Sequence, residues 1–308
     1  MRILVTGGAG FIGSNLVDRL LAEGHRVLVI DNFTTARSDS LPTGADGLTV
    51  HDATIAERAV VEAAYEEAQP DVVVHCAASY KDPDAWEEDI ATNATGTAHV
   101  AQVAKEHGVE RLIYFQTALC YGSRPLEHPV TLAHPLRPES SYAISKTTGE
   151  EYVALSGLDF VSLRLANIFG PRNLSGPIPT FWQRLSEGKS CVAVNTRRDF
   201  VFIDDLLQVV GRAIAGTGHG HYHVSSGRDF SIKELYEAVA SAMGVDEPVE
   251  DRERGEDDAP SILLDPSRTE ADFDWRASTP LAEGIRRTTE WYEGHGVAET
   301  YTHLRMRD

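Results

Sequence analysis

Two short motifs in the middle of the chain contain side chains that can take and return protons. YFQTALCYG, residues 114–122, includes Thr117 and Cys120, and YAISK includes Tyr142 and Lys146. Tyr142 and Lys146 are four residues apart, a spacing that places both on one face of a helix. A free phenol has a pKa of about 10, so it acts as a base near neutrality only where a cation such as Lys146 favours the phenolate. Thr117 ends a predicted strand and could donate to or accept from the same substrate oxygen.

A Tyr and a Lys four residues apart often form a surface pair without a catalytic role. A glycine-rich turn near the N-terminus makes the catalytic interpretation more specific, because it predicts a nucleotide-binding fold. TGGAGFIG lies between the first predicted strand and the first predicted helix. Glycine is needed where the backbone turns sharply and approaches a pyrophosphate, and the helix N-terminus supplies N–H donors and a positive dipole. The residues of this turn expected to bind the cofactor are Gly7, Gly10, Phe11, Ile12 and Gly13.

Acidic residues at the ends of the next two predicted strands favour NAD as the dinucleotide. Asp31 ends the second strand, eighteen residues after Gly13. A carboxylate there can accept both ribose hydroxyls and repels the 2′-phosphate of NADP. We therefore expect NAD to be bound through Asp31 and Asn32, although Arg37 is a side chain that a 2′-phosphate would favour. Asp52, after the third strand, either accepts from the adenine amino group or is an exposed turn aspartate.

The order of apolar runs predicts an α/β fold with a doubly wound parallel sheet of the Rossmann type. Short Val-, Ile- and Leu-rich runs are typical of strands buried on both faces, and helical stretches separate them. The strands are expected at 3–6, 27–30, 48–50, 72–75, 112–116 and 161–165, and the helices at 11–23, 55–68, 86–107 and 142–156. We predict an NAD-binding domain over residues 1–165 and a smaller substrate-binding lobe over 166–308, where Pro- and Gly-rich sequence loosens this order.

Composition excludes several classes of partner. Lys and Arg total 28 against 47 Asp and Glu, so a net charge of -19 opposes binding to nucleic acid or to an anionic membrane. No window is apolar enough for a membrane span, and the start leaves no room for a signal peptide. Cys76, Cys120 and Cys191 show no metal-type pairing, which indicates reduced thiols in a cytoplasmic protein. The histidines show no ligand spacing, so no metal is predicted.

With these motifs in place, the chain resembles the extended short-chain dehydrogenase/reductase family, the NAD-dependent nucleotide-sugar epimerases and dehydratases. The segments that carry the resemblance occur in family order: TGGAGFIGSNLVDRLLAEGHRVLVIDN, VVHCAAS, TNATGT, YGSRPLEHP, YAISKTTGE, RLANIFGP and RRDFVFIDD. The resemblance implies that Thr117 is the catalytic Ser/Thr and Tyr142 the general base. It implies that Lys146 lowers the pKa of the tyrosine and holds the nicotinamide ribose.

The same resemblance implies further binding residues. Ala77 and Ala78 match positions that line the dinucleotide, and Asn93 matches a helix residue on the cofactor side that orders the active-site strand. The substrate is expected to be a nucleotide sugar, with UDP-hexosamine favoured. Its predicted contacts are Lys81, Asn167 as a phosphate contact, Arg198 as the partner of the diphosphate, and either Arg252 or Arg254 as a late arginine contact.

The turn after Thr117 decides which reaction is expected once C4 of the sugar has been oxidised. The 4,6-dehydratases of the family resemble TDEVYG, whose Asp-Glu pair supplies acid and base, and 4-epimerases resemble SATVYG. This chain has TALCYG, without either carboxylate. Cys120 stands where an aliphatic residue is usual, and it either packs as a small apolar residue or exchanges a proton at the C5–C6 end of the sugar.

With its cysteine, FQTALCYG most resembles the UDP-N-acetylglucosamine 5,6-dehydratases of tunicamycin biosynthesis. The leading hypothesis is therefore dehydration to a 5,6-ene sugar with the hydride returned to C4. A UDP-sugar 4-epimerase is the alternative, and an NAD-binding sensor without catalysis is a further one. The helices at 86–107 and 142–156 match elements that relatives pair into a dimer, so a homodimer is expected.

Overall fold

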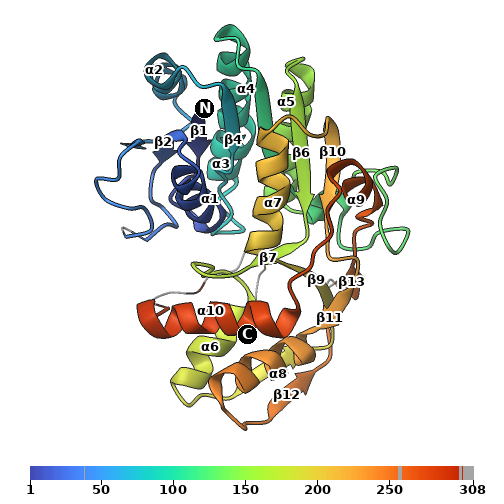
Figure 1. The fold of residues 1–308 in the computed structure, drawn as a ribbon. Helices are drawn as coiled ribbons and strands as arrows, with labels where there is room; N and C mark the ends of the chain where they lie inside the picture. Colours follow the sequence, from blue (N-terminus) through green and yellow to red (C-terminus); the bar gives the residue numbers. More distant parts are fainter. Residues whose placement is uncertain (38, 256–258, 298–299, 301–308) are drawn as a thin grey trace.

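A seven-stranded parallel sheet forms the upper part of the molecule (Figure 1). The computed structural model describes residues 1–37, 39–255, 259–297 and 300. The strand order is β10-β6-β5-β4-β1-β2-β3, so the winding direction reverses between β1 and β4. The strands are β1 (Arg2–Thr6), β2 (Arg26–Asp31), β3 (Leu48–Asp52), β4 (Val72–His75), β5 (Arg111–Thr117), β6 (Phe160–Leu165) and β10 (Gly220–Val224). Ligands of such sheets bind beyond the carboxyl ends of the strands at this reversal.

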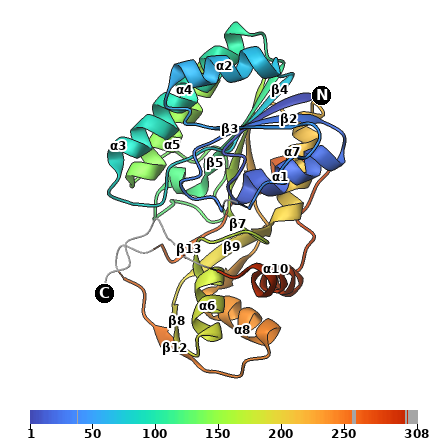
Figure 2. The same ribbon diagram turned by 90° about the vertical axis from the view of Figure 1, so that its left-hand side faces the viewer.

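Helices cover both faces of this sheet, which explains its continuous apolar strands (Figure 2). Ile3 and Val5 of β1 pack in the cluster that contains α1 (Phe11–Ala22) and α7 (Ile203–Ile214). Leu4 faces the other way, into the cluster with α2 (Arg58–Ala68), α4 (Thr97–Glu106) and α5 (Ser141–Leu155). The prediction of a doubly wound parallel α/β sheet is therefore confirmed.

A smaller lobe lies below the sheet in Figure 1. Its four-stranded sheet combines β7 (Asn167–Phe169), β9 (Arg197–Phe202), β11 (Asp229–Ser231) and β13 (Ser261–Ile262), and β8 (Cys191–Val194) pairs with β12 (Val249–Arg252). Three helices pack around these strands: α6 (Pro177–Ser186), α8 (Ile232–Met243) and α10 (Leu281–His295). In the chain, these elements of the lobe follow the glycine turn and strands β1 to β6.

The predicted division at residue 165 differs from the observed arrangement in one respect. Helix α7, strand β10 and helix α9 (Ser267–Phe273) come later in the chain but pack on the large sheet. Strand β10 pairs with β6 over Gly220–Val224, and its GHYHV sequence lacks the apolar run that marks the other strands. The predicted lobe also includes residues 256–258, 298–299 and 301–308, which lie outside the described residues.

The predicted helix at 86–107 contains an irregular segment. It is observed as α3 (Trp86–Asp89), a π-helical segment η1 (Ile90–Gly96) and α4. The Thr97 hydroxyl donates to the Asn93 carbonyl at 2.7 Å. A π-helical segment is rare and often marks a functional region, because it turns side chains off the regular helical spacing.

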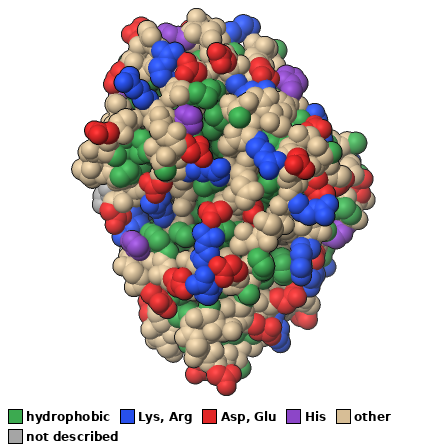
Figure 3. Space-filling model, in the orientation of Figure 1, with side chains coloured by type: hydrophobic (Ala, Val, Ile, Leu, Met, Phe, Trp, Pro, Cys, Tyr) green, Lys and Arg blue, Asp and Glu red, His purple; other side chains and the backbone are tan. Residues whose placement is uncertain are grey.

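The described residues contain neither a helix that could span a membrane nor a group of side chains that could bind a metal ion. No described helix is both long and apolar enough to cross a membrane. No group of three His, Cys, Asp or Glu side chains among the described residues is placed to hold a metal ion. On the face shown in Figure 3, basic side chains are interspersed with acidic ones.

A buried ion pair fastens α5 to the sheet. Glu150 is fully buried, and its carboxylate accepts from Arg164 Nη2 at 2.8 Å and Nε at 3.1 Å. Ser162 Oγ donates to the same carboxylate at 2.5 Å. Arg164 also donates to the hydroxyl of Tyr121 at 2.7 Å, so the pair connects α5, β6 and the turn after β5.

Removing one partner of this pair should destabilise the fold strongly. We expect Glu150→Ala to lower the free energy of unfolding by about 3 to 5 kcal/mol, because it leaves the Arg164 cation buried without its counter-charge. Urea titration followed by circular dichroism measures the change. Glu151→Ala, at the exposed neighbouring position, serves as the control and should cost less than about 1 kcal/mol. Equal losses in the two variants would contradict a structural role for the pair.

Candidate active site

The glycine turn leaves space for a pyrophosphate but not for side chains. Gly7 has φ +67°, and a Cβ there would lie 2.6 Å from the Cα of Ala77. A Cβ on Gly13 would overlap the Gly7 carbonyl oxygen and lie 2.7 Å from the Cα of Gly8. Helix α1 begins directly after Gly10 without a side-chain cap, so its first N–H groups remain for a ligand. This cradle fits the pyrophosphate of NAD.

Asp31 connects the glycine turn to the end of β2. One carboxylate oxygen accepts from the backbone N–H of Ala9 at 2.9 Å, and the other accepts from that of Phe33 at 2.8 Å. Burial raises the pKa of Asp31, and these backbone donors oppose the shift. The carboxylate is therefore held at the predicted ribose position with lone pairs that can still accept hydroxyl groups.

Neighbouring charges agree with NAD rather than NADP. Arg37 forms a two-pronged ion pair with Asp39, at 2.8 and 2.9 Å, and also donates to the His295 carbonyl at 3.0 Å. The Arg37 guanidinium is thus already paired with Asp39 and with the end of α10, which disfavours a role in binding a 2′-phosphate. Asn32 directly follows β2 and Asp52 ends β3, and both side chains are exposed. Their contacts with the cofactor stay predictions.

Asn93 holds the loop that follows β4. It is fully buried, its amide oxygen accepts from Ser79 N at 2.8 Å, and its amide nitrogen donates to Ser79 O at 2.9 Å and Ser145 Oγ at 3.0 Å. Ala77 and Ala78 lie partly buried in the same loop, and Ala77 N donates to Thr6 Oγ1 at 3.3 Å. Asn93 therefore connects this loop to α5, and its assignment to the cofactor site stays a prediction.

Thr117 is the last residue of β5, and its hydroxyl is oriented by the turn that follows. Thr117 Oγ1 accepts from Leu119 N at 3.2 Å and caps the short 3₁₀ turn η2 (Ala118–Tyr121). Because the oxygen accepts this N–H, the hydroxyl hydrogen can point away from the turn and donate to a substrate oxygen.

Gln116 is a site residue that the sequence analysis missed. Its side chain is 2% exposed; the amide oxygen accepts from Thr117 N at 2.8 Å, and the amide nitrogen donates to the Lys146 carbonyl at 3.2 Å. One side chain thereby connects the end of β5 to the middle of α5. A polar residue within the apolar run LIYFQT was the only signal in the sequence.

Tyr142 and Lys146 lie one turn apart near the start of α5, as the spacing predicts. Ser140 caps this helix by accepting from Ala143 N at 3.2 Å, so Tyr142 sits in the first turn. Lys146 is 2% exposed, and its ammonium nitrogen lies 4.1 Å from the centre of the Tyr114 ring. Tyr114 donates its hydroxyl to the Lys146 carbonyl at 2.8 Å, which fixes this turn of the helix against β5.

Burial favours the neutral form of both residues. It raises the pKa of Tyr142, and the negative charge of Asp89 adds to this effect. Burial also lowers the pKa of Lys146 to about 7, while Cys76 and Glu150 oppose the shift. The predicted lowering of the tyrosine pKa by the lysine is therefore not seen in the protein alone. A lysine with a pKa near neutrality can nevertheless be either protonated or neutral during a reaction.

Cys120 is buried away from solvent. It lies in η2, is 0% exposed, and packs in a small apolar cluster with Tyr121, Val130 and Leu264. Burial raises the pKa of its thiol to about 12, with Arg164 opposing. This position favours the packed apolar alternative, and the predicted proton exchange between Cys120 and a sugar is not supported by it.

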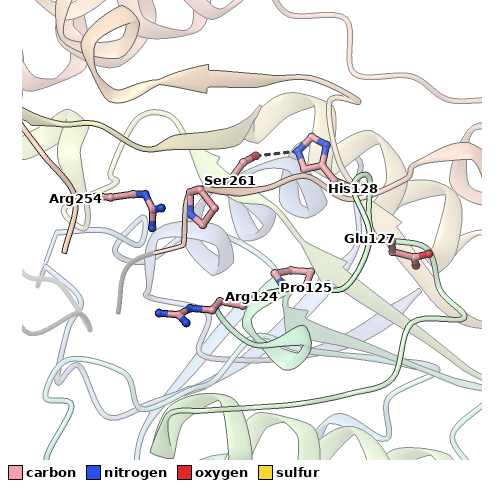
Figure 4. Close-up of a pocket in the computed structure, with 7 residues that line it drawn as sticks. Arg124, Pro125, Glu127, His128, Arg254 and Ser261 are labelled. Carbon is pink, nitrogen blue, oxygen red and sulfur yellow. Dashed lines mark hydrogen bonds between the residues drawn. The ribbon is translucent and has the colours of Figure 1, made fainter. Parts of the chain in front are cut away.

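Arginines from both parts of the molecule line a cavity of about 580 Å³ (Figure 4). Arg124 comes from the loop after η2, and Arg254 comes from the segment before β13; His128 of that loop hydrogen-bonds Ser261 at 3.0 Å. Glu127 is held by Thr131 and points away from the arginines in Figure 4. Oppositely placed cations of this kind can hold an anionic group.

The remaining predicted substrate residues differ in their position relative to this cavity. Arg198 lies beside the cavity, where it donates to the Ala259 carbonyl at 2.9 Å, and Asn167 donates to the Asp199 carbonyl at 2.9 Å. Arg252 lies on β12 in the small lobe sheet, beside Glu250 at 3.5 Å. Of the two late arginines, Arg254 therefore lines the cavity and Arg252 does not. Lys81 is exposed in the loop after β4.

Comparison with known proteins agrees with this geometry. Residues 3–225 match the NAD dependent epimerase/dehydratase family. WbmH of Bordetella bronchiseptica, solved with NAD⁺, is 52% identical with a TM-score of 0.93, over 96% of this chain and 99% of that one. WbmG of the same bacterium, solved with NAD and UDP, is 45% identical with a TM-score of 0.92, over 99% and 98%. UDP-glucose 4-epimerase of Mycolicibacterium smegmatis is 32% identical over 95% of this chain and 98% of its own length.

Loss of the Gln116 bridge should slow turnover without unfolding the protein. We expect Gln116→Leu to lower kcat for the nucleotide-sugar substrate about 10-fold or more with little change in KM, because a displacement of about 1 Å between reacting groups costs up to ~100-fold. Steady-state kinetics and circular dichroism measure both effects. Gln102→Leu, on the exposed side of α4, is the control and should match the parent. A kcat equal to that of the parent would show that Gln116 does not position the site.

Proposed function

The chain belongs to the NAD-dependent epimerase/dehydratase family, and on that premise we propose that it inverts C4 of a UDP-sugar through a transient 4-keto sugar. It is an NAD-dependent enzyme of nucleotide sugars, as the sequence analysis predicted. The full-length similarity to a UDP-glucose 4-epimerase and the UDP bound by WbmG support this reaction and this nucleotide.

The composition of η2 is the observation that carries the proposal. Ala118 and Leu119 directly follow Thr117 and pack toward the apolar cluster around Cys120. Neither can act as an acid or a base, so the turn lacks the Asp-Glu pair with which the 4,6-dehydratases of the family remove water. Proton exchange at C4 is assigned to Tyr142 and Lys146 of α5, and these suffice for oxidation and reduction at C4.

Each step uses groups whose positions are described above. NAD, held by the glycine turn and Asp31, would supply reversible hydride transfer at C4 of the sugar. Tyr142 takes the proton of the 4-hydroxyl as C4 is oxidised, and gives a proton back to that oxygen when C4 is reduced from its other face. Thr117 donates its hydroxyl hydrogen to the same oxygen, and Gln116 holds Thr117 and Lys146 in register. Lys146, in its protonated form, favours the phenolate of Tyr142.

The diphosphate of the substrate is assigned to the cavity between the two parts of the molecule. Arg254 lines that cavity and Arg198 lies beside it, which agrees with the roles that the family resemblance implies. Lys81 and Asn167 are proposed to complete the substrate contacts, and a UDP-hexosamine remains the favoured substrate. NAD is assigned to the glycine turn, Asp31 and the loop that contains Ala77 and Ala78.

Dehydration of UDP-N-acetylglucosamine across C5 and C6 is the second candidate. It draws on the position of Cys120 in the same turn as Thr117. The buried thiol, with its pKa near 12, would have to leave its apolar cluster before it could exchange a proton with a sugar. A sensor without catalysis would be favoured by loss of Tyr142 or Lys146, and both residues are present in the chain.

Product analysis separates these reactions. We expect purified protein with catalytic NAD to convert UDP-N-acetylglucosamine or UDP-glucose into a product of unchanged mass with altered proton couplings. Tyr142→Phe should lower turnover by about 100-fold or more, and Cys120→Ala should stay within about threefold of the parent, because a packed thiol contributes only apolar contacts. Mass spectrometry and proton NMR read the outcome. Loss of one water from the product, blocked by Cys120→Ala, would instead establish the dehydratase.

The exposed apolar side chains of two adjacent helical regions support a homodimer, which we also propose. Trp86 and Ile90 are 64% and 57% exposed on α3 and η1, and Ile144, Tyr152 and Leu155 are 52%, 44% and 78% exposed on α5. These regions pack against each other, so their exposed residues can form one face. A face of this kind is typical of contacts between copies of a chain.

Charges on this helical face should separate the subunits. We expect the parent to have the mass of a dimer in size-exclusion chromatography with light scattering, and Ile144→Asp/Leu155→Asp to have that of a monomer, because like charges would be buried without partners and would repel one another. Leu126→Lys is the control, since Leu126 is 66% exposed on the cavity loop and lies off these helices. A monomeric parent, or a variant that stays dimeric, would contradict this interface.

A further inference from the structure

A hydrogen-bonded chain of three side chains lies at the edge of the cavity, and no step of the proposed reaction uses it. Nε2 of His128, in the loop after η2, lies 3.0 Å from Oγ of Ser261 in β13. Ser261 Oγ lies 2.6 Å from Oδ2 of Asp229 in β11. His128 and Ser261 both line the cavity (Figure 4). The chain therefore connects the loop after η2 to the smaller lobe beside the proposed diphosphate site.

The direction of each hydrogen bond in this chain follows from the charge of Asp229. Its other oxygen, Oδ1, pairs with Arg197 Nε at 2.8 Å. Burial opposes ionisation of Asp229, but hydrogen bonds from Ser261 and Arg197 outweigh burial and lower the pKa of this carboxyl. An ionised carboxylate only accepts, so Ser261 donates its single hydroxyl hydrogen to Asp229. Ser261 Oγ can then only accept from His128, which places a hydrogen on Nε2 of the imidazole.

With this hydrogen fixed on Nε2, the second ring nitrogen of His128 decides what the ring offers to a ligand. In the neutral imidazole Nδ1 carries a lone pair, whereas in the protonated imidazole both nitrogens donate. Within the part of the chain that the structure describes, the ring hydrogen-bonds only through Nε2. The side chain is 51% exposed at the cavity wall, so an anion in the cavity can reach the ring. A lone pair on Nδ1 would repel that anion, and an N–H there would bind it.

The charges around His128 oppose one another until an anion is bound. Asp229 Oδ2 lies 3.8 Å from Nε2, and its negative charge favours the protonated ring. Arg124 and Arg254 line the same cavity, and their positive charges disfavour it. A diphosphate between the two arginines would offset their charge and add negative charge beside the ring. The charged groups around the ring are Arg124 and Glu127 from its own loop, Arg197 and Arg198 from β9, Asp229 from β11, and Arg254 from the segment before β13.

We propose that His128 is a further ligand of the substrate diphosphate, and that binding draws a proton from the solvent onto Nδ1 of its ring. The new N–H donates to a phosphate oxygen, while Nε2 keeps its hydrogen bond to Ser261. Charged donors bind phosphate more strongly than neutral ones, and histidine changes its charge readily near neutral pH. The proposal rests on the assignment of the diphosphate to this cavity, and it makes substrate affinity dependent on pH.

Proton uptake on binding tests this role without relying on activity. Isothermal titration calorimetry of the NAD-loaded protein with UDP-glucose, repeated in buffers of different ionisation heat, counts the protons taken up. Both phosphates of UDP-glucose lack a second acidic hydrogen, so the count reports on the protein. Every sample carries Tyr142→Phe, which suppresses the heat of turnover. We expect uptake of about half a proton per ligand at pH 7, and an affinity that falls about fivefold or more from pH 6 to pH 8, because a proton bound with the ligand is lost as the pH rises.

His128→Gln is the matched variant, because its amide nitrogen can still donate to Ser261 but cannot gain a charge. We expect it to abolish the proton uptake and to make the affinity for UDP-glucose nearly independent of pH. His107→Gln, at the exposed end of α4, is the control and should behave as the background protein does. Circular dichroism checks the folding of each variant, and His128→Asn repeats the titrations if the glutamine variant folds poorly.

The outcomes separate this inference from the proposed function. Absence of proton uptake, or equal uptake with and without the His128 imidazole, would overturn the role of His128. An affinity for UDP-glucose that is unchanged by Arg254→Gln would instead show that the diphosphate binds outside this cavity, and would refute the assignment on which the proposal rests. The chemistry at C4 is tested independently by product analysis, because the titrations measure binding alone.

Discussion

The attachment of α5 to the end of β5 is the contact on which the site depends. The Lys146 carbonyl accepts from Tyr114 Oη at 2.8 Å and from Gln116 Nε2 at 3.2 Å, and Gln116 also holds the backbone N–H of Thr117. These bonds fix the position of α5 along the axis of β5. Thr117 and Tyr142 belong to these two rigid elements, so a shift of one element along the other would separate their hydroxyl groups from the proposed common substrate oxygen.

The site also carries charges that the fold would be more stable without. Burial lowers the pKa of Lys146 to about 7, and Asp89 is buried with no hydrogen-bond partner for its carboxylate among the residues that the structure describes. The Glu150–Arg164 pair one turn beyond Lys146 is, by contrast, fully hydrogen-bonded and joins α5 to β6. The hydrogen-bonded Glu150–Arg164 pair thus stabilises helix α5, whose first turns carry the buried side chain of Lys146. Stable scaffolds commonly hold reactive residues that lower the stability of the fold.

Local patterns in the sequence were sufficient for the elements that bind the dinucleotide, but not for contacts that depend on the tertiary fold. The strands up to β6, the glycine turn and the helical placement of Tyr142 and Lys146 were predicted, because apolar runs, glycine and helical spacing act over a few residues. Strand β10 was missed, since its alternating histidines lack an apolar run. Gln116, and the choice of Arg254 over Arg252, depend on partners distant in sequence. The sequence also could not show on which side of η2 the Cys120 thiol lies.

The direction of Cys120 matters because the turn that carries it is held at both ends. Thr117 caps its start, and Arg164 binds Tyr121 at its close. Gly122 follows with φ +83°, where a Cβ would lie 2.6 Å from the Arg137 carbonyl, so the chain leaves the turn through a conformation that only glycine fits readily. Within this turn the buried thiol lies in its apolar cluster with Val130 and Leu264. The anchored turn therefore supports the proposed epimerisation over a dehydration that would need Cys120 to reach the sugar.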